Sequence, residues 1–320
     1  MLPHLLIYAL SFVGIWIGSG LALKSIERLS RIMKLSSFAV SFIVLGFFTS
    51  VSEFSVGINS ILKNDPEIYV GNLIGASIVI TMMIVPLLAI VGNKIRINLE
   101  FQGFNLPASL VVISLPVILA MDGRIGQTDS IIAISLFGFL VISIQSKKGI
   151  LERIKEINAK ATIKMGKELL RVIFGIATIF IASRFIVEQT IYFSELLKVS
   201  PFLISLLLIA VGTNVPELSF VVRSAFVKNK QVIFGDYVGS ASFNTFLLGL
   251  LTLMYGKPVI LTNSYLVSLL FLIAGLVLFY YFARSKNTIS RLEGLILLLM
   301  YFLFFATEIF IHRGSLQLPF

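Results

Sequence analysis

One stretch of the sequence occurs twice, and this duplication restricts the folds that the chain can adopt. A threonine, a glutamate, a serine and two glycines recur at a constant offset of 164 positions: Thr49, Glu53, Ser60, Gly71 and Gly75 in the first copy, and Thr213, Glu217, Ser224, Gly235 and Gly239 in the second. No insertion or deletion interrupts this offset. Each half of the chain should therefore fold into the same kind of unit, as internal repeats do.

The composition places these repeats in a membrane. Hydrophobic residues make up 57% of the 320 residues and charged residues only 13%, which leaves too little polar surface to cover a water-soluble domain. Ten apolar stretches are long enough to cross a bilayer, near residues 4–23, 36–60, 69–92, 105–121, 130–146, 169–190, 200–224, 232–255, 262–283 and 292–312. The sequence therefore predicts an all-α polytopic membrane protein with about ten transmembrane helices.

The repeat offset relates the second predicted span to the seventh, so each repeat contains five spans. Because five is an odd number, the second repeat enters the membrane in the opposite orientation, as in the inverted repeats of secondary transporters. The predicted organisation is a first repeat over 1–146 with its motif near 45–80, a basic cytoplasmic linker over 147–168, and a second repeat over 169–320 with its motif near 209–244. The basic linker fits either a helix on the inner leaflet or a solvated linker helix.

Lysine and arginine residues are distributed unevenly between the loops. Twenty of the 26 fall in one set of alternate loops, which includes the linker. Short cytoplasmic loops collect basic residues, so both termini are predicted to lie outside. This distribution accounts for the net charge of +10 without a nucleic-acid partner. The chain has no cysteine, which excludes disulfides and thiolate metal sites.

Glu53 and Glu217 are the strongest candidate functional residues, because each lies in an apolar span. An ionisable residue at membrane depth is costly unless it faces a partner, a cavity or an ion. Thr49 and Thr213 each precede a glutamate by four residues, so each hydroxyl shares a helix face with a carboxylate. Hard cations such as Ca²⁺ bind oxygen ligands of this kind, and two carboxylates neutralise one divalent ion. For the repeated glycines, close helix packing is favoured over a role in ligand binding.

The residues around the second glutamate resemble a known family. Residues 212–218 read Gly-Thr-Asn-Val-Pro-Glu-Leu, and with residues 235–244 they are similar to the alpha repeats of the calcium/cation antiporter superfamily, nearest to its prokaryotic sodium/calcium exchangers. The resemblance covers nearly the whole chain. It implies a secondary active antiporter, not an enzyme, that exchanges sodium for calcium by alternating access at a midplane site formed by Glu53 and Glu217. It further implies that Ca²⁺ and Na⁺ are the transported ions, that no cofactor is needed, and that the protein lies in a prokaryotic plasma membrane.

The resemblance assigns ion-binding roles to residues of both repeats: Glu53, Thr49, Ser50, Glu217, Thr213, Asn214, Ser240 and Asn244. The first copy departs from the family pattern. Ser52 replaces a proline, and Ala76 and Ile80 stand at positions that a serine and an asparagine occupy in the second copy. These changes remove oxygen donors from the first half of the site, which Ser77 would restore in part. Asp236, an acid where the family commonly has asparagine, is interpreted either as part of the inner mouth of the pathway or as a helix cap.

Three alternatives to sodium/calcium exchange follow from the same residues. The chain could exchange another cation pair, such as calcium for protons or two monovalent ions. It could also be a degenerate member that keeps the fold without transport. An intramembrane aspartyl protease is suggested by the pair Gly235-Asp236, but it would need a second aspartate inside the membrane. This reading is disfavoured because Asp122 and Asp129 fall in a predicted outer loop.

Three other charged residues lie near the predicted outer ends of spans: Arg184, Glu188 and Glu308. Long side chains at such positions reach the membrane interface, so no ion role is predicted for them. The predicted partners are inorganic cations and the lipid bilayer, and the sequence contains no signal for an oligomeric state.

Overall fold

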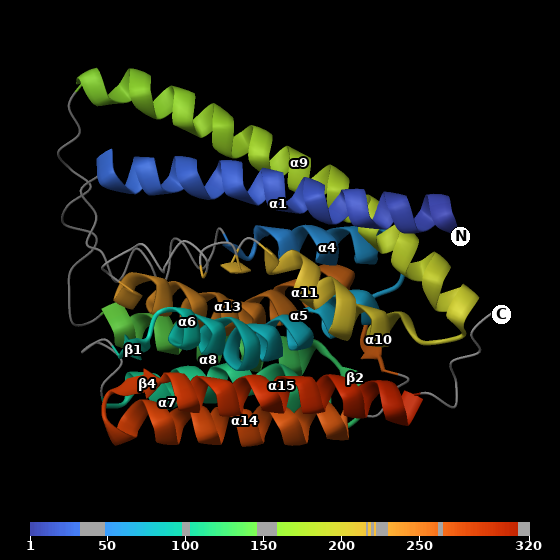
Figure 1. Ribbon diagram of the computed structural model, residues 1–320. Coiled ribbons are helices and arrows are strands. Elements are labelled where there is room, and N and C mark those ends of the chain that lie inside the picture. The colour runs from blue at the N-terminus through green and yellow to red at the C-terminus, as the bar shows by residue number, and fades with distance from the viewer. Residues whose placement is uncertain are drawn as a thin grey trace.

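The computed structural model describes residues 1–32, 49–97, 103–145, 159–215, 217–218, 221, 230–261 and 265–312. Within these residues the chain forms helices, two π-helical turns (η2 and η5) and four short strands (Figure 1): α1 (Leu2–Ile32), α4 (Val51–Leu62), α5 (Glu67–Val79), η2 (Ile80–Ile84), α6 (Val85–Val91), β1 (Lys94–Arg96), α7 (Asn105–Leu119), β2 (Arg124–Ile125), α8 (Gln127–Gln145), α9 (Ala159–Leu197), α10 (Pro201–Ile204), η5 (Ser205–Ile209), α11 (Ala210–Thr213), α13 (Lys230–Tyr255), β3 (Val259–Ile260), α14 (Leu266–Ser285), β4 (Thr288–Ser290) and α15 (Arg291–His312). The predicted all-α class is confirmed.

Seven described helices are long and apolar enough to cross a membrane, beginning with α1 and ending with α15. The helix α7 and the segment Pro201–Thr213, which comprises α10, η5 and α11, are shorter apolar helices. The second predicted span belongs to the described residues only from Thr49 onward, where it continues as α4. Taken in order, these elements correspond to the ten spans expected from the sequence. The helix α9 begins at Ala159, inside the predicted linker, and linker residues 147–158 lie outside the described residues.

The two small sheets join one repeat to the other at opposite ends of the bundle. In the first sheet β1 pairs antiparallel with β4, with Lys94 opposite Ser290. In the second β2 pairs with β3, with Arg124 opposite Ile260. The offset that relates the repeats carries β1 onto β3 and β2 onto β4, and Figure 1 shows β1 and β4 at one end of the bundle and β2 at the other. Equivalent strands therefore lie at opposite ends, as an inverted duplication requires.

Left-handed backbone conformations precede the strands of both repeats. Gly123 comes directly before β2 with φ of 78°, and Asn287 comes directly before β4 with φ of 51°. Asn93 precedes β1 with φ of 69°. Glycine and asparagine are the residues that tolerate this region best, because their side chains are absent or can bond locally. The turn chemistry that starts the strands is thus repeated in the two halves.

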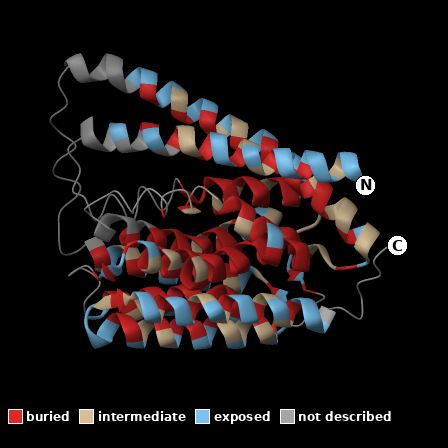
Figure 2. Ribbon diagram, in the orientation of Figure 1, coloured by how far each residue is buried: buried red, intermediate tan, exposed pale blue. Residues whose placement is uncertain are grey.

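Burial decreases from the centre of the bundle outward (Figure 2). In the third span, Glu67–Val91, 83% of the most apolar stretch is buried. In the eighth, Tyr237–Tyr255, the buried share is 78%. For Gln127–Ile144 and Arg291–Ile311 the buried share is only 22% and 28%. These outer helices expose large apolar side chains such as Phe310. Contact of such side chains with water costs free energy, whereas contact with lipid tails does not. The most buried spans are those that carry the repeated glycines.

Two of the repeated glycines allow the third and seventh spans to approach closely. A Cβ atom on Gly71 would lie 2.6 Å from the carbonyl oxygen of Phe202, and one on Gly75 would collide with the carbonyl oxygen of Leu206. A larger residue at either position would push the seventh span away from α5. The packing role predicted for these two glycines is therefore confirmed.

The orientation predicted from the basic loops can be tested with single cysteines, because the chain has none of its own. Ser285 is exposed at the end of α14, and a Cβ on Gly126 would make only ordinary van der Waals contact. Outside-facing termini place Gly126 outside and Ser285 inside. We expect an impermeant thiol reagent added to intact cells to label Gly126→Cys and to spare Ser285→Cys until the cells are permeabilised. The reverse labelling pattern would overturn the orientation while leaving the inverted repeat intact.

Candidate cation site

The glutamates of the two repeats are buried in the bundle. Glu53, near the start of α4, is 1% exposed, and Glu217 is 0% exposed. Asn214 of the second repeat donates from Nδ2 to Oε1 of Glu53 at 3.4 Å. Tyr237 of α13 donates from its hydroxyl to the backbone carbonyl of Glu217 at 2.9 Å. Because neither carboxylate reaches water, groups inside the protein or a bound ion have to balance their charge.

Ser52 links the first glutamate to the second repeat. Its hydroxyl lies 2.8 Å from Oε2 of Glu53, 3.2 Å from the carbonyl oxygen of Thr49 and 3.4 Å from the carbonyl oxygen of Thr213. From the sequence, Ser52 was interpreted only as the loss of a proline, and this role was not predicted. The available signal was its place in a polar run, directly before the glutamate and three residues after Thr49.

Two further contacts cross between the repeats. The hydroxyls of Ser50 and Ser240 share a hydrogen bond of 3.2 Å. Asn244 of α13 donates from Nδ2 to Oγ of Ser77 of α5 at 3.3 Å. All four residues are at most 2% exposed. Ser77, which the sequence predicted to restore part of the missing polarity, thus lies directly against the amide of the second repeat.

Thr213 contacts the third span rather than facing apolar side chains alone. Its hydroxyl lies 3.3 Å from Oδ1 of Asn72 and 3.4 Å from the carbonyl oxygen of Ala210. Thr213 and Asn72 are both 0% exposed, and Thr49 is 2% exposed. No role was predicted for Asn72 from the sequence, although an amide in a largely apolar helix is a signal for a polar partner. The second, third, seventh and eighth spans therefore contribute to one buried polar cluster.

Two amide oxygens of this cluster receive no hydrogen bond from the described residues. They are Oδ1 of Asn214 and Oδ1 of Asn244, and both are buried. A buried acceptor without a donor costs about 1–3 kcal/mol, a cost that a bound cation removes. The described residues contain no group of three or more His, Cys, Asp or Glu side chains that could hold a metal ion. Neutral oxygens near carboxylates favour a hard cation over a transition metal.

Three further positions near the site depart from the family pattern: Ala76, Ile80 and Asp236. Ala76 and Ile80 are 0% exposed, so the first repeat presents buried apolar groups at the positions of Ser240 and Asn244. Asp236 belongs to α13, but its side chain lies outside the described part of the structure. Its assignment to the inner mouth of the pathway stays a prediction.

The prediction that Glu308 reaches the membrane interface is wrong. This residue of α15 is 2% exposed, and its Oε1 accepts a hydrogen bond of 2.8 Å from Oγ of Ser268 in α14. The side chain points at the neighbouring helix because a buried hydroxyl there satisfies the carboxyl group better than an apolar surface would. Hydropathy indicated the depth of Glu308 in the membrane but not the direction that it faces.

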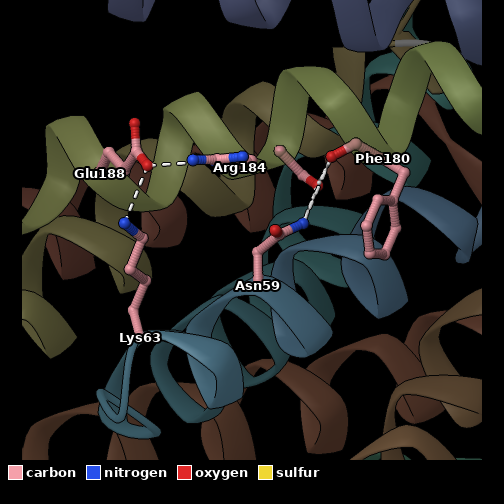
Figure 3. Close-up of polar contacts among 6 residues, drawn as sticks. Asn59, Lys63, Phe180, Arg184 and Glu188 are labelled. Atoms are coloured by element: carbon pink, nitrogen blue, oxygen red, sulfur yellow. Dashed lines mark hydrogen bonds and ion pairs between the residues drawn. The ribbon is translucent and has the colours of Figure 1, made fainter.

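Beyond the glutamate, α4 is held by α9 (Figure 3). Asn59 donates from Nδ2 to Oγ of Ser183 at 2.8 Å and lies 3.3 Å from the carbonyl oxygen of Phe180. At the end of α4, Nζ of Lys63 and Nε of Arg184 lie 2.8 Å and 3.2 Å from Oε1 of Glu188. These charges are partly exposed, as predicted for Arg184 and Glu188, so the ion pairs contribute little stability. Together the contacts fix the register of the helix that carries Glu53.

One carboxyl group in the loop after α4 has an unusual acidity. Burial and, to a smaller extent, the negative charge of Glu67 raise the pKa of Asp65 to about 6. The loop between the second and third spans therefore loses negative charge as the pH falls through about 6.

The fold and the polar cluster together define a class of protein. Inverted repeats with an oxygen-rich buried site where the copies meet are typical of secondary transporters that carry cations. The chain belongs to the family of sodium/calcium exchanger proteins, which matches residues 3–144 and 167–310. It is therefore an integral membrane protein that exchanges cations, a transporter rather than an enzyme.

Individual relatives agree with this membership. The sodium/calcium exchanger MaX1 of Methanosarcina acetivorans is 24% identical over an alignment of 347 positions, which covers 96% of this chain and 99% of that protein. An uncharacterized membrane protein of Methanocaldococcus jannaschii is 24% identical over 300 residues, covering 94% and 96% of the two chains. A solved structure of the sodium-calcium exchanger NCX_Mj, soaked with Na⁺ and Sr²⁺, has a TM-score of 0.69 at 22% identity over 96% of this chain and 99% of that chain. The predicted superfamily and inverted-repeat fold are confirmed.

Proposed function

We propose that the protein exchanges Na⁺ for Ca²⁺ by alternating access, with the ions bound near the midplane of the membrane by Glu53 and Glu217. The observation that carries the proposal is the polar contact between the repeats, where Asn214 of one copy reaches the carboxylate of Glu53 in the other. Inverted-repeat transporters bind their ions where the copies meet, because that place can open to either side of the membrane. MaX1 and NCX_Mj, which share this fold or family, are both named as sodium/calcium exchangers.

The proposed ion ligands come from four spans, two in each repeat: Glu53, Thr49, Ser50 and Ser77 in the first, and Glu217, Thr213, Asn214, Ser240 and Asn244 in the second, with Asp236 closer to the inner side. Ca²⁺ takes six to eight oxygen ligands, and two carboxylates neutralise its charge while hydroxyl and amide oxygens complete the shell. Na⁺ uses the same oxygens with half the charge. Because both ions need the same two carboxylates, they compete for the site, which is the requirement for antiport.

The first half of the proposed site retains more hydroxyl groups near its ligands than the comparison of the two sequence repeats indicates. Ser52 brings a hydroxyl to the carboxylate of Glu53, and Ser77 brings one to the amide of Asn244. These hydroxyls support binding of a cation where the family's proline and two polar positions are missing. The contacts therefore favour a transporting protein over a degenerate member that only keeps the fold.

Ion flux into vesicles tests the proposal and separates it from its alternatives. Purified protein in vesicles loaded with Na⁺ should take up radioactive Ca²⁺ when external Na⁺ is low, and uptake should stop when Na⁺ is equal on both sides. A proton gradient alone should drive no uptake. Uptake driven by protons instead would assign calcium/proton exchange. Absence of gradient-driven uptake by folded protein, for Ca²⁺ and for monovalent ions, would assign the degenerate reading.

The remaining features of the proposal concern organisation. We propose repeats over 1–146 and 169–320 joined by a basic cytoplasmic linker over 147–168, in a prokaryotic plasma membrane with both termini outside. The cysteine labelling of Gly126→Cys and Ser285→Cys described above tests this orientation.

A further inference from the structure

An apolar groove runs along the seam between α7 and α14, on the side of the bundle away from α1 and α9 (Figure 1). Its volume is about 240 Å³, and it is lined mainly by Leu110, Val111, Ser114, Ile273, Val277 and Tyr280. Val111 and Val277 are 58% and 61% exposed, so the groove opens on the lipid-facing surface. None of its lining residues belongs to α4, α5, α11 or α13, so the groove is separate from the buried polar cluster around Glu53.

A polar pocket continues this groove at the end of α14. The pocket has a volume of about 280 Å³, and its lining includes Leu106, Tyr280, Arg284 and Asn287. Tyr280 lines both cavities, so the apolar groove and the polar pocket adjoin. The lining residues of α14 recur at intervals of three or four and therefore occupy one face of the helix.

The groove and the polar pocket together span the length of one leaflet of a bilayer. Eleven residues of α14 separate Ile273 from Arg284, which at about 1.5 Å per residue spans about 16 Å. Half of a hydrocarbon core about 30 Å thick is about 15 Å. An acyl chain lying in the groove would therefore bring its headgroup to the level of Arg284.

The side chain of Arg284 is held by Tyr280 and has donors left over for an anion at that level. Its Nη1 donates to the hydroxyl of Tyr280 at 2.8 Å, and its guanidinium carbon lies 5.8 Å from the centre of the Tyr280 ring, which fixes the orientation of the side chain. The ion pairs formed among the described residues do not include Arg284. Arg96 is exposed nearby on β1, so the surface beside the pocket carries a further positive charge. A planar guanidinium with unused donors matches the geometry of a phosphate group.

We propose that the seam between α7 and α14 binds one anionic glycerophospholipid. Its phosphate lies against Arg284 and Asn287 in the polar pocket, and one acyl chain fills the groove from Tyr280 to Ile273. A zwitterionic lipid offers the same apolar chain but less net attraction to a basic pocket, so the site selects for headgroup charge.

Quenching of a single tryptophan beside the groove tests the proposal on the full chain in nanodiscs. Trp16→Phe removes the one native tryptophan, and Ala274→Trp places another at an exposed position next to Ile273 that does not line the groove. Lipids with brominated acyl chains then quench the tryptophan when they lie against α14. We expect half-maximal quenching at about fivefold lower mole fraction of brominated phosphatidylglycerol than of brominated phosphatidylcholine, since one basic residue contributes about 1 kcal/mol to anionic-lipid binding.

Three variants of this reporter separate a built site from diffuse surface charge. Arg284→Gln should abolish the preference for phosphatidylglycerol. Ser114→Phe should weaken it as well, because it fills the groove without changing charge. Lys286→Gln, an equally basic and exposed position that does not line the pocket, should leave the preference unchanged. Absence of any preference in the reporter protein, a preference that survives Arg284→Gln, or an equal loss in Lys286→Gln would overturn the proposal.

Discussion

Replacing either Glu53 or Glu217 with glutamine is expected to abolish gradient-driven Ca²⁺ uptake. Both side chains are buried, and glutamine keeps their size while removing the charge. A carboxylate about 4 Å from a monovalent ion contributes about 4 kcal/mol at an effective dielectric constant of about 20, equivalent to roughly a thousandfold in affinity. A divalent ion loses more. Flux into vesicles, with protein amount and thermal unfolding measured for each variant, checks the result.

The chain provides a matched control for this experiment. Glu308 is also a buried carboxyl group in a membrane span, but it accepts its hydrogen bond from Ser268 between α14 and α15, outside the polar cluster. Glu308→Gln should therefore retain exchange. Uptake that persists in Glu53→Gln or Glu217→Gln would contradict the proposal that both glutamates bind the same ion. Loss of uptake in all three variants would mean that removing any buried carboxyl group abolishes transport.

The second large effect is expected at Asn244. Replacing it with isoleucine removes the donor to Ser77 and an amide oxygen that accepts no hydrogen bond from the described residues. An apolar group cannot replace an oxygen ligand, and loss of such a group costs about 2 kcal/mol, equivalent to roughly 30-fold in binding. We expect calorimetric titration to show Ca²⁺ binding to Asn244→Ile weakened to this extent or lost. Thr245→Val is the matched control, since the Thr245 hydroxyl donates to the carbonyl of Val112 instead.

The reciprocal change should act in the opposite direction. Ile80 is buried at the position that Asn244 holds in the second repeat, so Ile80→Asn adds the amide that the first repeat lacks. We expect stronger cation binding or a wider range of bound ions, measured by Ca²⁺ and Na⁺ titrations. Unchanged titrations in both Ile80→Asn and Asn244→Ile would show that these two positions do not face the ion.

Much of the fold follows from patterns that act locally. The offset between Thr49 and Thr213, the length of the apolar stretches and the parity of the spans together predicted the inverted repeat, because each can be read from the sequence without knowing any contact between the repeats. The burial of Glu53 and Glu217 followed from their apolar surroundings for the same reason. Glycine spacing likewise predicted where the third span would pack closely.

The contacts within the site could not be predicted in this way. Ser52 reaches the carbonyl of Thr213, and Ser77 meets Asn244, across roughly 160 residues of chain in each case. Such pairs depend on how the repeats cross, which no helical period encodes. The π-helical turns η2 and η5 also shift side-chain directions within their spans, and nothing in the residues of Ile80–Ile84 marks the extra residue of such a turn.

The pairing of strands across the repeats has a consequence for synthesis of the chain. Because β1 bonds to β4 and β2 bonds to β3, neither sheet can form while only the first five spans have been made. β4 follows β1 by roughly 190 residues, which takes on the order of ten seconds or more at about 5–20 residues per second. During that time the edges of β1 and β2 lie unpaired at the two membrane surfaces. The first repeat therefore stays in the bilayer without its strand partners until the second, inverted repeat has been synthesised.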